Sequence, residues 1–357
     1  MFNVYLDPSS YVYLSNEIFK EDTKYNKDNC LLPWRYLKAY CLERGINLNT
    51  IDFWQEDKAT DSDVYLSHDH KSLFRRAYWH FKKDKRYPIK INLNKFKKRV
   101  LFQFEPPIVM PDVYAKFDSV VKNYDEVYFV SRVEGLKCNR LQLYQTYNKE
   151  FKEYFNNSNR KFLSIISTNK SPRSLGKFLA QIGSGAGLKY WGYKELFGER
   201  IKAINFFSKY NEIDVYGNEW NKLPFFPYWF YKKSIQRAYK GPAQNRHKTM
   251  SEYKFSIAFE NSIVPGFITE RIFDAFYSGT VPIYLGASDI IDYIPKDCFI
   301  DMRDFKNYEE LRSFLKSLKD SDIENYRKNI LNFLASEKFR PFTKEYFVET
   351  FVKAVTG

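Results

Sequence analysis

Cysteine is scarce in this 357-residue sequence, and its placement argues against two kinds of small stabilised fold. The four cysteines are widely separated and form no CxxC pair: Cys30, Cys41, Cys138 and Cys298. Such scatter indicates neither a disulfide scaffold nor a zinc site. A reducing compartment is therefore the simplest setting for the chain.

Long apolar runs are absent as well. No window approaches the roughly eighteen uninterrupted apolar residues of a membrane-spanning helix. The N-terminal residues, MFNVYLDPSS, lack the basic and then apolar segments of a secretory signal. We therefore expect a cytoplasmic protein, with peripheral attachment to the inner membrane face as the alternative.

Acidic residues are outnumbered, since 57 Lys and Arg oppose 43 Asp and Glu and leave a net charge of +14. This excess favours anionic partners: nucleic acid, phosphorylated small molecules or an acidic membrane. The sharpest basic clusters, 81–86 and 95–99, are interpreted as solvated faces rather than nucleic-acid-binding arms. No recognisable nucleic-acid-binding motif accompanies them.

Short apolar runs alternate with helical patterns along the whole chain, which predicts an α/β fold with parallel sheets. In the first half the expected strands are 2–6, 63–67, 99–105, 126–131 and 161–167, with a helix at 32–45. In the second half we expect strands at 213–217, 254–259 and 281–286, and helices at 200–210, 269–278, 307–318, 322–335 and 342–355.

Length and pattern together predict two Rossmann-like halves. We place an N-terminal domain at 1–160, a C-terminal domain at 161–340, and at 341–357 a last helix that packs back on the first domain. Two Gly-rich or Pro-aromatic stretches, 181–199 and 221–248, are expected to be long loops or small subdomains.

The stretch FSIAFENSIVPGFITERIF (255–273) carries the densest polar signal. Glu260 and Asn261 follow a buried strand at its carboxyl end, where open α/β sheets bind ligands. Thr269 is a good N-cap, and Gly279 is placed to end the helix that follows.

Arg271 is unusual because a cation in the first turn of a helix opposes the helix dipole. A bound phosphate would make that position favourable. The alternative is a surface ion pair with Asp274, three residues on. Spacing alone leaves both interpretations open.

The run KFSIAFENSIVPGFITERIFDAFYSGTVPIYLG (254–286) resembles the signature of the α1,3/4-fucosyltransferases, glycosyltransferase family 10. That signature is close to Y-K-F-x-x-x-F-E-N-S, then Y-[IV]-T-E-K, then G-x-[VI]-P-[VI]. The segment at 292–311 also resembles the family's continuation. The resemblance implies an inverting enzyme of the GT-B fold, with two facing Rossmann-like domains, a cleft between them, and GDP-fucose held by the C-terminal domain.

The same resemblance implies donor-binding roles. Glu270 would contact hydroxyls of the ribose or sugar, Arg271 the phosphates, and Asn261 would line the pocket with Glu260 beside it. Two residues depart from the family pattern: Phe267 replaces a tyrosine, and Arg271 replaces a lysine. These changes leave the donor sugar less defined than the fold.

Two further roles follow from the resemblance. A phosphate-binding arginine before the V-D-x-Y-G strand corresponds best to Arg200, with Arg173 as the competitor. The general base corresponds to Glu105, at the end of the run RVLFQFEPP, where Pro106 stops the strand and turns the carboxylate out of the sheet.

No metal site is predicted. The spaced acids at 61–63 and 320–322 lie in turn-like stretches, and His68, Asp69 and His70 are interpreted as an acceptor-lining or exposed trio rather than zinc ligands. The family implies no required cofactor, with Mn²⁺ or Mg²⁺ at most a non-essential stimulant.

The leading hypothesis is a fucosyltransferase that acts on an oligosaccharide or glycolipid. A transferase using another GDP-sugar is the near rival, and a basic nucleic-acid-binding protein is the rival of another class. The stretch PFFPYWFYKK (224–233) is expected to be a folded aromatic loop, with an acceptor lid or a membrane-seeking patch as alternatives. Sequence predicts no oligomeric state.

Overall fold

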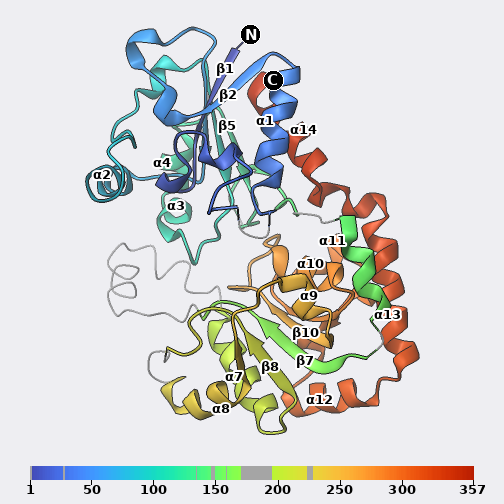
Figure 1. Ribbon diagram of the computed structural model, residues 1–357. Helices are drawn as coiled ribbons and strands as arrows, with labels where there is room; N and C mark the ends of the chain where they lie inside the picture. Colours follow the sequence, from blue (N-terminus) through green and yellow to red (C-terminus); the bar gives the residue numbers. More distant parts are fainter. Residues whose placement is uncertain are drawn as a thin grey trace. The chain divides into compact units, whose positions relative to one another are not determined.

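The computed structural model describes residues 2–26, 29–133, 135–145, 149–157, 159–169, 195–222 and 228–357. The chain divides into two compact units. Unit 1 comprises residues 1–146 and 340–357, and unit 2 comprises 147–339. Each unit has a parallel six-stranded sheet with helices on both faces (Figure 1).

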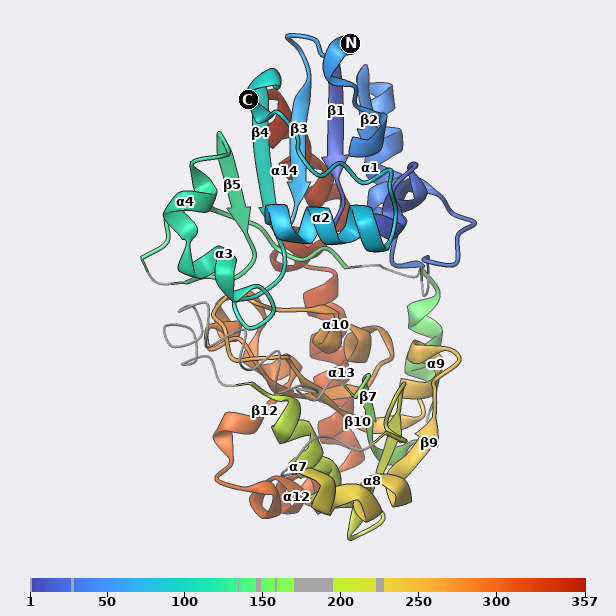
Figure 2. The same cartoon turned by 90° about the vertical axis from the view of Figure 1, so that its left-hand side faces the viewer.

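The sheet of unit 1 has the strand order β2-β1-β3-β4-β5-β6. Its strands are β1 (Phe2–Asp7), β2 (Ile46–Thr50), β3 (Val64–His68), β4 (Lys98–Gln103), β5 (Glu126–Phe129) and β6 (Asn139–Arg140). Its helices are α1 (Leu32–Glu43), α2 (Leu73–Lys82), α3 (Pro111–Ala115), α4 (Phe117–Val121) and α14 (Lys344–Thr356). Figure 2 shows α2 in front of this sheet, α14 behind it, and α3 and α4 beside β5.

The sheet of unit 2 has the order β12-β11-β10-β7-β8-β9. Its strands are β7 (Lys161–Ile166), β8 (Ile213–Tyr216), β9 (Tyr239–Gly241), β10 (Tyr253–Phe259), β11 (Val281–Leu285) and β12 (Ile300–Asp301). Its helices are α7 (Phe197–Ser208), α8 (Lys232–Ala238), α9 (Arg246–Met250), α10 (Glu270–Tyr277), α11 (Ile290–Tyr293), α12 (Tyr308–Ser317) and α13 (Asp320–Leu334).

The structure confirms the strands and helices predicted from the apolar runs, with ends that shift by a few residues. The central strands β10 and β11 are buried almost throughout, because helices cover both faces of a parallel sheet. Sequence reasoning missed several elements, namely β2, α2, α3, α4, β6, α11, β12 and the short elements between 228 and 250. The predicted loop at 221–248 contains α8, β9 and the start of α9, whereas most of 181–199 lies outside the described residues.

The first unit boundary lies at 146/147 and not at 160/161. The reason is the packing of the segment before β7. The carbonyl oxygen of Phe155 accepts a hydrogen bond from Arg327 of α13, and Arg160 donates to the carbonyl oxygen of Ser278 after α10, at 3.3 Å. These contacts hold the segment in unit 2.

The second boundary lies at 339/340, so α14 belongs to unit 1. Phe347 and Phe351 of this helix meet Phe102 of β4, with ring centroids 6.4 and 6.2 Å apart. Edge-to-face aromatic contacts of this kind add to the burial of apolar area. The C-terminal helix therefore completes the core of the first unit.

Candidate functional site

The candidate site of unit 2 starts where β10 ends. The ladder continues for one residue, since the backbone N–H of Glu260 donates to the carbonyl oxygen of Leu285 at 2.8 Å. Gly286 then lies so close that a Cβ there would be 2.4 Å from Glu260 Cγ and from Tyr284 Oη. The absence of a side chain at Gly286 therefore allows Glu260 to be buried at the strand end.

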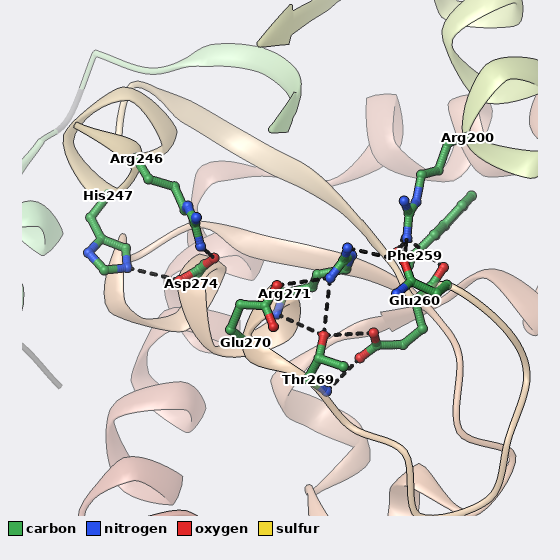
Figure 3. Close-up of polar contacts among 10 residues, drawn as sticks. Arg200, Arg246, His247, Phe259, Glu260, Thr269, Glu270, Arg271 and Asp274 are labelled. Carbon is green, nitrogen blue, oxygen red and sulfur yellow. Dashed lines mark hydrogen bonds and ion pairs between the residues drawn. The ribbon is translucent and has the colours of Figure 1, made fainter. Parts of the chain in front are cut away.

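Glu260 connects the end of β10 to the start of α10 (Figure 3). Its carboxylate is fully buried and accepts hydrogen bonds from the backbone N–H and the hydroxyl of Thr269, both at 2.7 Å. Thr269 is the N-cap, as predicted, and its backbone is extended. Burial raises the pKa of Glu260 to about 7.

Arg200, in the first turn of α7, donates hydrogen bonds to the end of β10. The guanidinium donates from Nε and Nη2 to the carbonyl oxygen of Phe259 at 3.1 and 2.6 Å, and from Nη2 to that of Glu260 at 2.6 Å. A further bond reaches Oδ1 of Asn261 at 3.2 Å. Burial, and then the charge of Arg271, lower the pKa of Arg200 to about 9.

Arg271, in the first turn of α10, also contacts the side-chain amide of Asn261. Its Nη2 donates to Oδ1 of Asn261 at 3.3 Å, and its Nη1 contacts Thr269 Oγ1 at 3.2 Å and Glu270 Oε1 at 2.9 Å. One amide oxygen is thus shared by two guanidinium groups. Like charges held this close are unfavourable unless an anion accompanies them.

The alternative pairing of Arg271 with Asp274 is wrong. Asp274 instead accepts from Arg246 Nη1 at 2.6 Å and lies 3.1 Å from His247 Nε2, so its carboxylate joins α10 to α9 (Figure 3). Sequence reasoning missed both partners, because they precede Asp274 by more than 25 residues and no periodicity relates them.

Two donors of the arginines are available for a ligand. Within the described ranges, Nη1 of Arg200 and Nε of Arg271 are buried and have no hydrogen-bond partner. Leaving a buried charged donor unpaired costs free energy. We call the set Arg200, Asn261 and Arg271 the arginine cluster. Its two open donors and its position at the start of α10 suit a bound phosphate group.

The structure brings together all but one of the residues predicted to bind the donor: Arg200, Glu260, Asn261, Glu270 and Arg271. The side chain of Glu270 is half-exposed at the edge of the arginine cluster. Phe267 is buried in the loop before α10, where its backbone N–H donates to the carbonyl oxygen of Val264 at 3.2 Å. Arg173 lies outside the described residues.

Glu105, the predicted general base, lies in unit 1, two residues after β4. Its backbone is held on both sides. The N–H donates to Oδ1 of Asp69 at 3.0 Å, and the carbonyl oxygen accepts from Tyr114 Oη at 2.8 Å and from Gln103 Nε2 at 3.1 Å.

The trio at 68–70 is not exposed. Asp69 is buried, His68 is stacked on Trp34 with ring centroids 5.0 Å apart, and burial lowers the pKa of His68 to about 3 and that of His70 to about 4. Both imidazoles are therefore neutral at pH 7. In the part of the chain that the structure describes, no three His, Cys, Asp or Glu side chains are grouped to hold a metal ion.

Two surface features bear on the remaining expectations. Trp229 and Phe230, from the predicted aromatic loop, are 50% and 68% exposed, whereas 223–227 lie outside the described residues. None of the described helices combines the length and the hydropathy that crossing a bilayer requires.

Comparison with known proteins finds a family match within unit 2. Residues 189–339 match the C-terminal domain of glycosyltransferase family 10 (fucosyltransferase), and the match ends where unit 2 ends. Over these residues the chain is similar to glycosyltransferase family 10. The family 10 match includes the whole arginine cluster, whereas Glu105 lies before it.

Curated fucosyltransferases are similar to this chain over shorter segments. The chain is 36% identical over 100 residues to the α-(1,3)-fucosyltransferase FucT of Helicobacter pylori, which covers 27% of this chain and 21% of that protein. It is 43% identical over 77 residues to an α-(1,4)-fucosyltransferase of Arabidopsis thaliana, covering 22% and 19%. The chain therefore matches only about a fifth of the length of these relatives.

A solved structure supports the fold over the whole chain. The crystal structure of an α1,3-fucosyltransferase with GDP-fucose aligns with a TM-score of 0.51 and 14% identity, covering 100% of this chain and 90% of that one. The fold of the chain is GT-B, as the resemblance implied.

The raised pKa of Glu260 leads to a prediction about stability. The folded state keeps a proton that the unfolded chain releases, so the free energy of unfolding should fall as pH rises from about 4.5 to about 7. A pKa shift of this size corresponds to roughly 3 kcal/mol of unfolding free energy. Glu260→Gln, which mimics the protonated form, should flatten the curve over this window, as measured by chemical denaturation.

The matched control is Glu309→Gln, which changes an exposed glutamate of the same unit. This variant should keep the pH dependence of the unaltered protein. If Glu260→Gln and Glu309→Gln gave the same curve, Glu260 would not be the group that titrates.

Proposed function

We propose that the protein is an inverting fucosyltransferase that transfers L-fucose from GDP-fucose to a glycan hydroxyl. The observation that carries the proposal is the arginine cluster, with two open, buried donors inside the family 10 domain. The names of the relatives support fucose as the sugar, and the name of the Helicobacter pylori relative supports an α1,3 linkage. The acceptor we propose is an N-acetylglucosamine-type residue of a cell-surface oligosaccharide or glycolipid.

The arginine cluster would bind the diphosphate of the donor. Nη1 of Arg200 and Nε of Arg271 gain an anionic partner, and the repulsion between the two guanidinium groups is relieved when negative charge lies beside both. The same contacts would stabilise GDP as it leaves with the bonding electrons. Charge neutralisation by arginines is also why we propose that no metal ion is required.

Glu105 would act as the general base. In an inverting transfer the acceptor oxygen forms a bond to the anomeric carbon of fucose while the bond from that carbon to the β-phosphate oxygen breaks. The proton of the acceptor hydroxyl passes to the carboxylate of Glu105. The fixed backbone of Glu105 supports this role, since a base must hold one geometry.

The near rival is a transferase for another GDP-sugar, favoured by Phe267 and Arg271 where the family has tyrosine and lysine. A calorimetric titration with GDP-fucose, GDP-mannose, GDP and UDP-glucose separates the two. We expect GDP-fucose to bind most tightly and UDP-glucose weakly. Equal binding of the three GDP compounds would favour the rival. If no nucleotide bound but nucleic acid bound in a salt-sensitive manner, the basic surface would be the functional one.

Arg271→Ala should weaken GDP-fucose binding by roughly 10- to 100-fold in the same titration, because a charge-assisted hydrogen bond contributes about 1.5–3 kcal/mol. Arg312→Ala is the control, since Arg312 also pairs with a glutamate of unit 2, Glu212, but stands at the surface. It should bind the donor like the unaltered protein. Equal losses in the two variants would argue against the arginine cluster as the phosphate site.

Glu105→Gln should leave GDP-fucose affinity close to that of the unaltered protein while it lowers kcat by roughly 10²- to 10⁴-fold, the usual range for a general base. The assay is GDP release with a glycan acceptor. A variant that loses donor affinity together with kcat would contradict the assigned role.

A further inference from the structure

The carboxylate of Asp69 bridges two strand ends of unit 1. Asp69 follows β3, and its Oδ1 accepts hydrogen bonds from the backbone N–H of Phe104 at 2.7 Å and of Glu105 at 3.0 Å, both after β4. Its own N–H donates to the carbonyl oxygen of Phe102 at 2.8 Å. Three hydrogen bonds from one residue therefore fix the peptide chain that leads to Glu105.

The backbone of Asp69 shows that the position is built for this contact. Its φ of +63° lies in the left-handed region, which residues other than glycine seldom adopt and which Asp and Asn tolerate best. The residue is only 5% exposed. Burial raises the pKa of the Asp69 carboxyl group, and the two backbone N–H donors and the nearby cations oppose that effect without cancelling it.

Two backbone N–H donors contact the carboxylate of Asp69, and the charges of Lys71 and Arg75 also lower its pKa. Lys71, the nearest buried amine in sequence, places its Nζ on the carbonyl oxygens of Asp7 and His68, at 2.8 and 2.7 Å, and 3.5 Å from Asp7 Oδ1. A buried carboxylate that accepts hydrogen bonds from two successive backbone N–H groups fixes the conformation of that backbone.

We propose that Asp69 is a positioning residue for Glu105. It acts through the backbone: the two amides held by Oδ1 set where the Glu105 side chain leaves the main chain. Pro106 restricts the backbone of Glu105 from the other side. The inference rests on the proposed function of Glu105 as the base, and it adds a residue outside the family 10 match that the reaction would need.

Asp69→Gly tests the inference, because glycine keeps the left-handed backbone and removes the acceptor. We expect kcat to fall by roughly 10- to 100-fold, since a displaced base loses its geometry. Donor affinity should stay unchanged, because the arginine cluster lies in unit 2. Asp69→Asn keeps Oδ1 and tolerates the same backbone, so it should restore kcat to within a few-fold.

The matched control is Asp63→Ala, at the other end of β3. Asp63 is also buried, and its carboxylate accepts from Asn3 Nδ2 at 2.9 Å and Thr60 Oγ1 at 2.7 Å. This variant should lose stability but keep kcat. If Asp63→Ala and Asp69→Gly lowered kcat alike, or if Asp69→Asn failed to restore it, Asp69 would be merely structural.

Hydrogen exchange gives a readout that does not depend on transfer. The amides of Phe104 and Glu105 should lose protection in Asp69→Gly and keep it in Asp63→Ala and Asp69→Asn. Unchanged protection in Asp69→Gly would overturn the positioning role. A third outcome is that Asp69→Gly loses protection but the unaltered protein transfers no fucose. That result would overturn the proposed function, while the contact between Asp69 and the backbone would stand.

Discussion

The hydrogen bonds from Arg200 to the carbonyl oxygens of Phe259 and Glu260 are the interaction on which the candidate site depends. A strand that ends inside a protein leaves carbonyl groups that need donors. Arg200 supplies them from α7, and this places a buried cation beside Asn261. The guanidinium of Arg200 therefore has two roles: it satisfies the carbonyl groups at the end of β10, and it supplies positive charge to the arginine cluster.

Glu260 holds the start of α10 beside the end of β10. Its buried carboxylate binds the N-cap of α10, so the helix start, and with it Arg271, is fixed relative to β10. Asp274 anchors the same helix to α9 through Arg246 and His247. Because α10 is held at both places, the guanidinium of Arg271 needs little rearrangement to meet an anion, and binding energy is not spent on ordering it.

Much of the fold and of this cluster could be predicted from sequence, for a physical reason. Strands such as β10 and β11 are buried on both faces and are therefore continuous apolar runs. Helix α2 was missed because its pattern is reversed: Phe74 and Phe81 are exposed while Arg76 is buried against Asp7. The contacts of Asp274 and Asp69 could not be predicted, because they join residues that only the folded sheet brings together.

A crystal structure with GDP bound tests the central claim most directly, that the arginine cluster of unit 2 is an anion site. We predict phosphate oxygens within hydrogen-bonding distance of Nη1 of Arg200 and Nε of Arg271, the two donors that lack partners among the described residues. A diphosphate bound elsewhere, with both of these donors still unpaired, would contradict the claim.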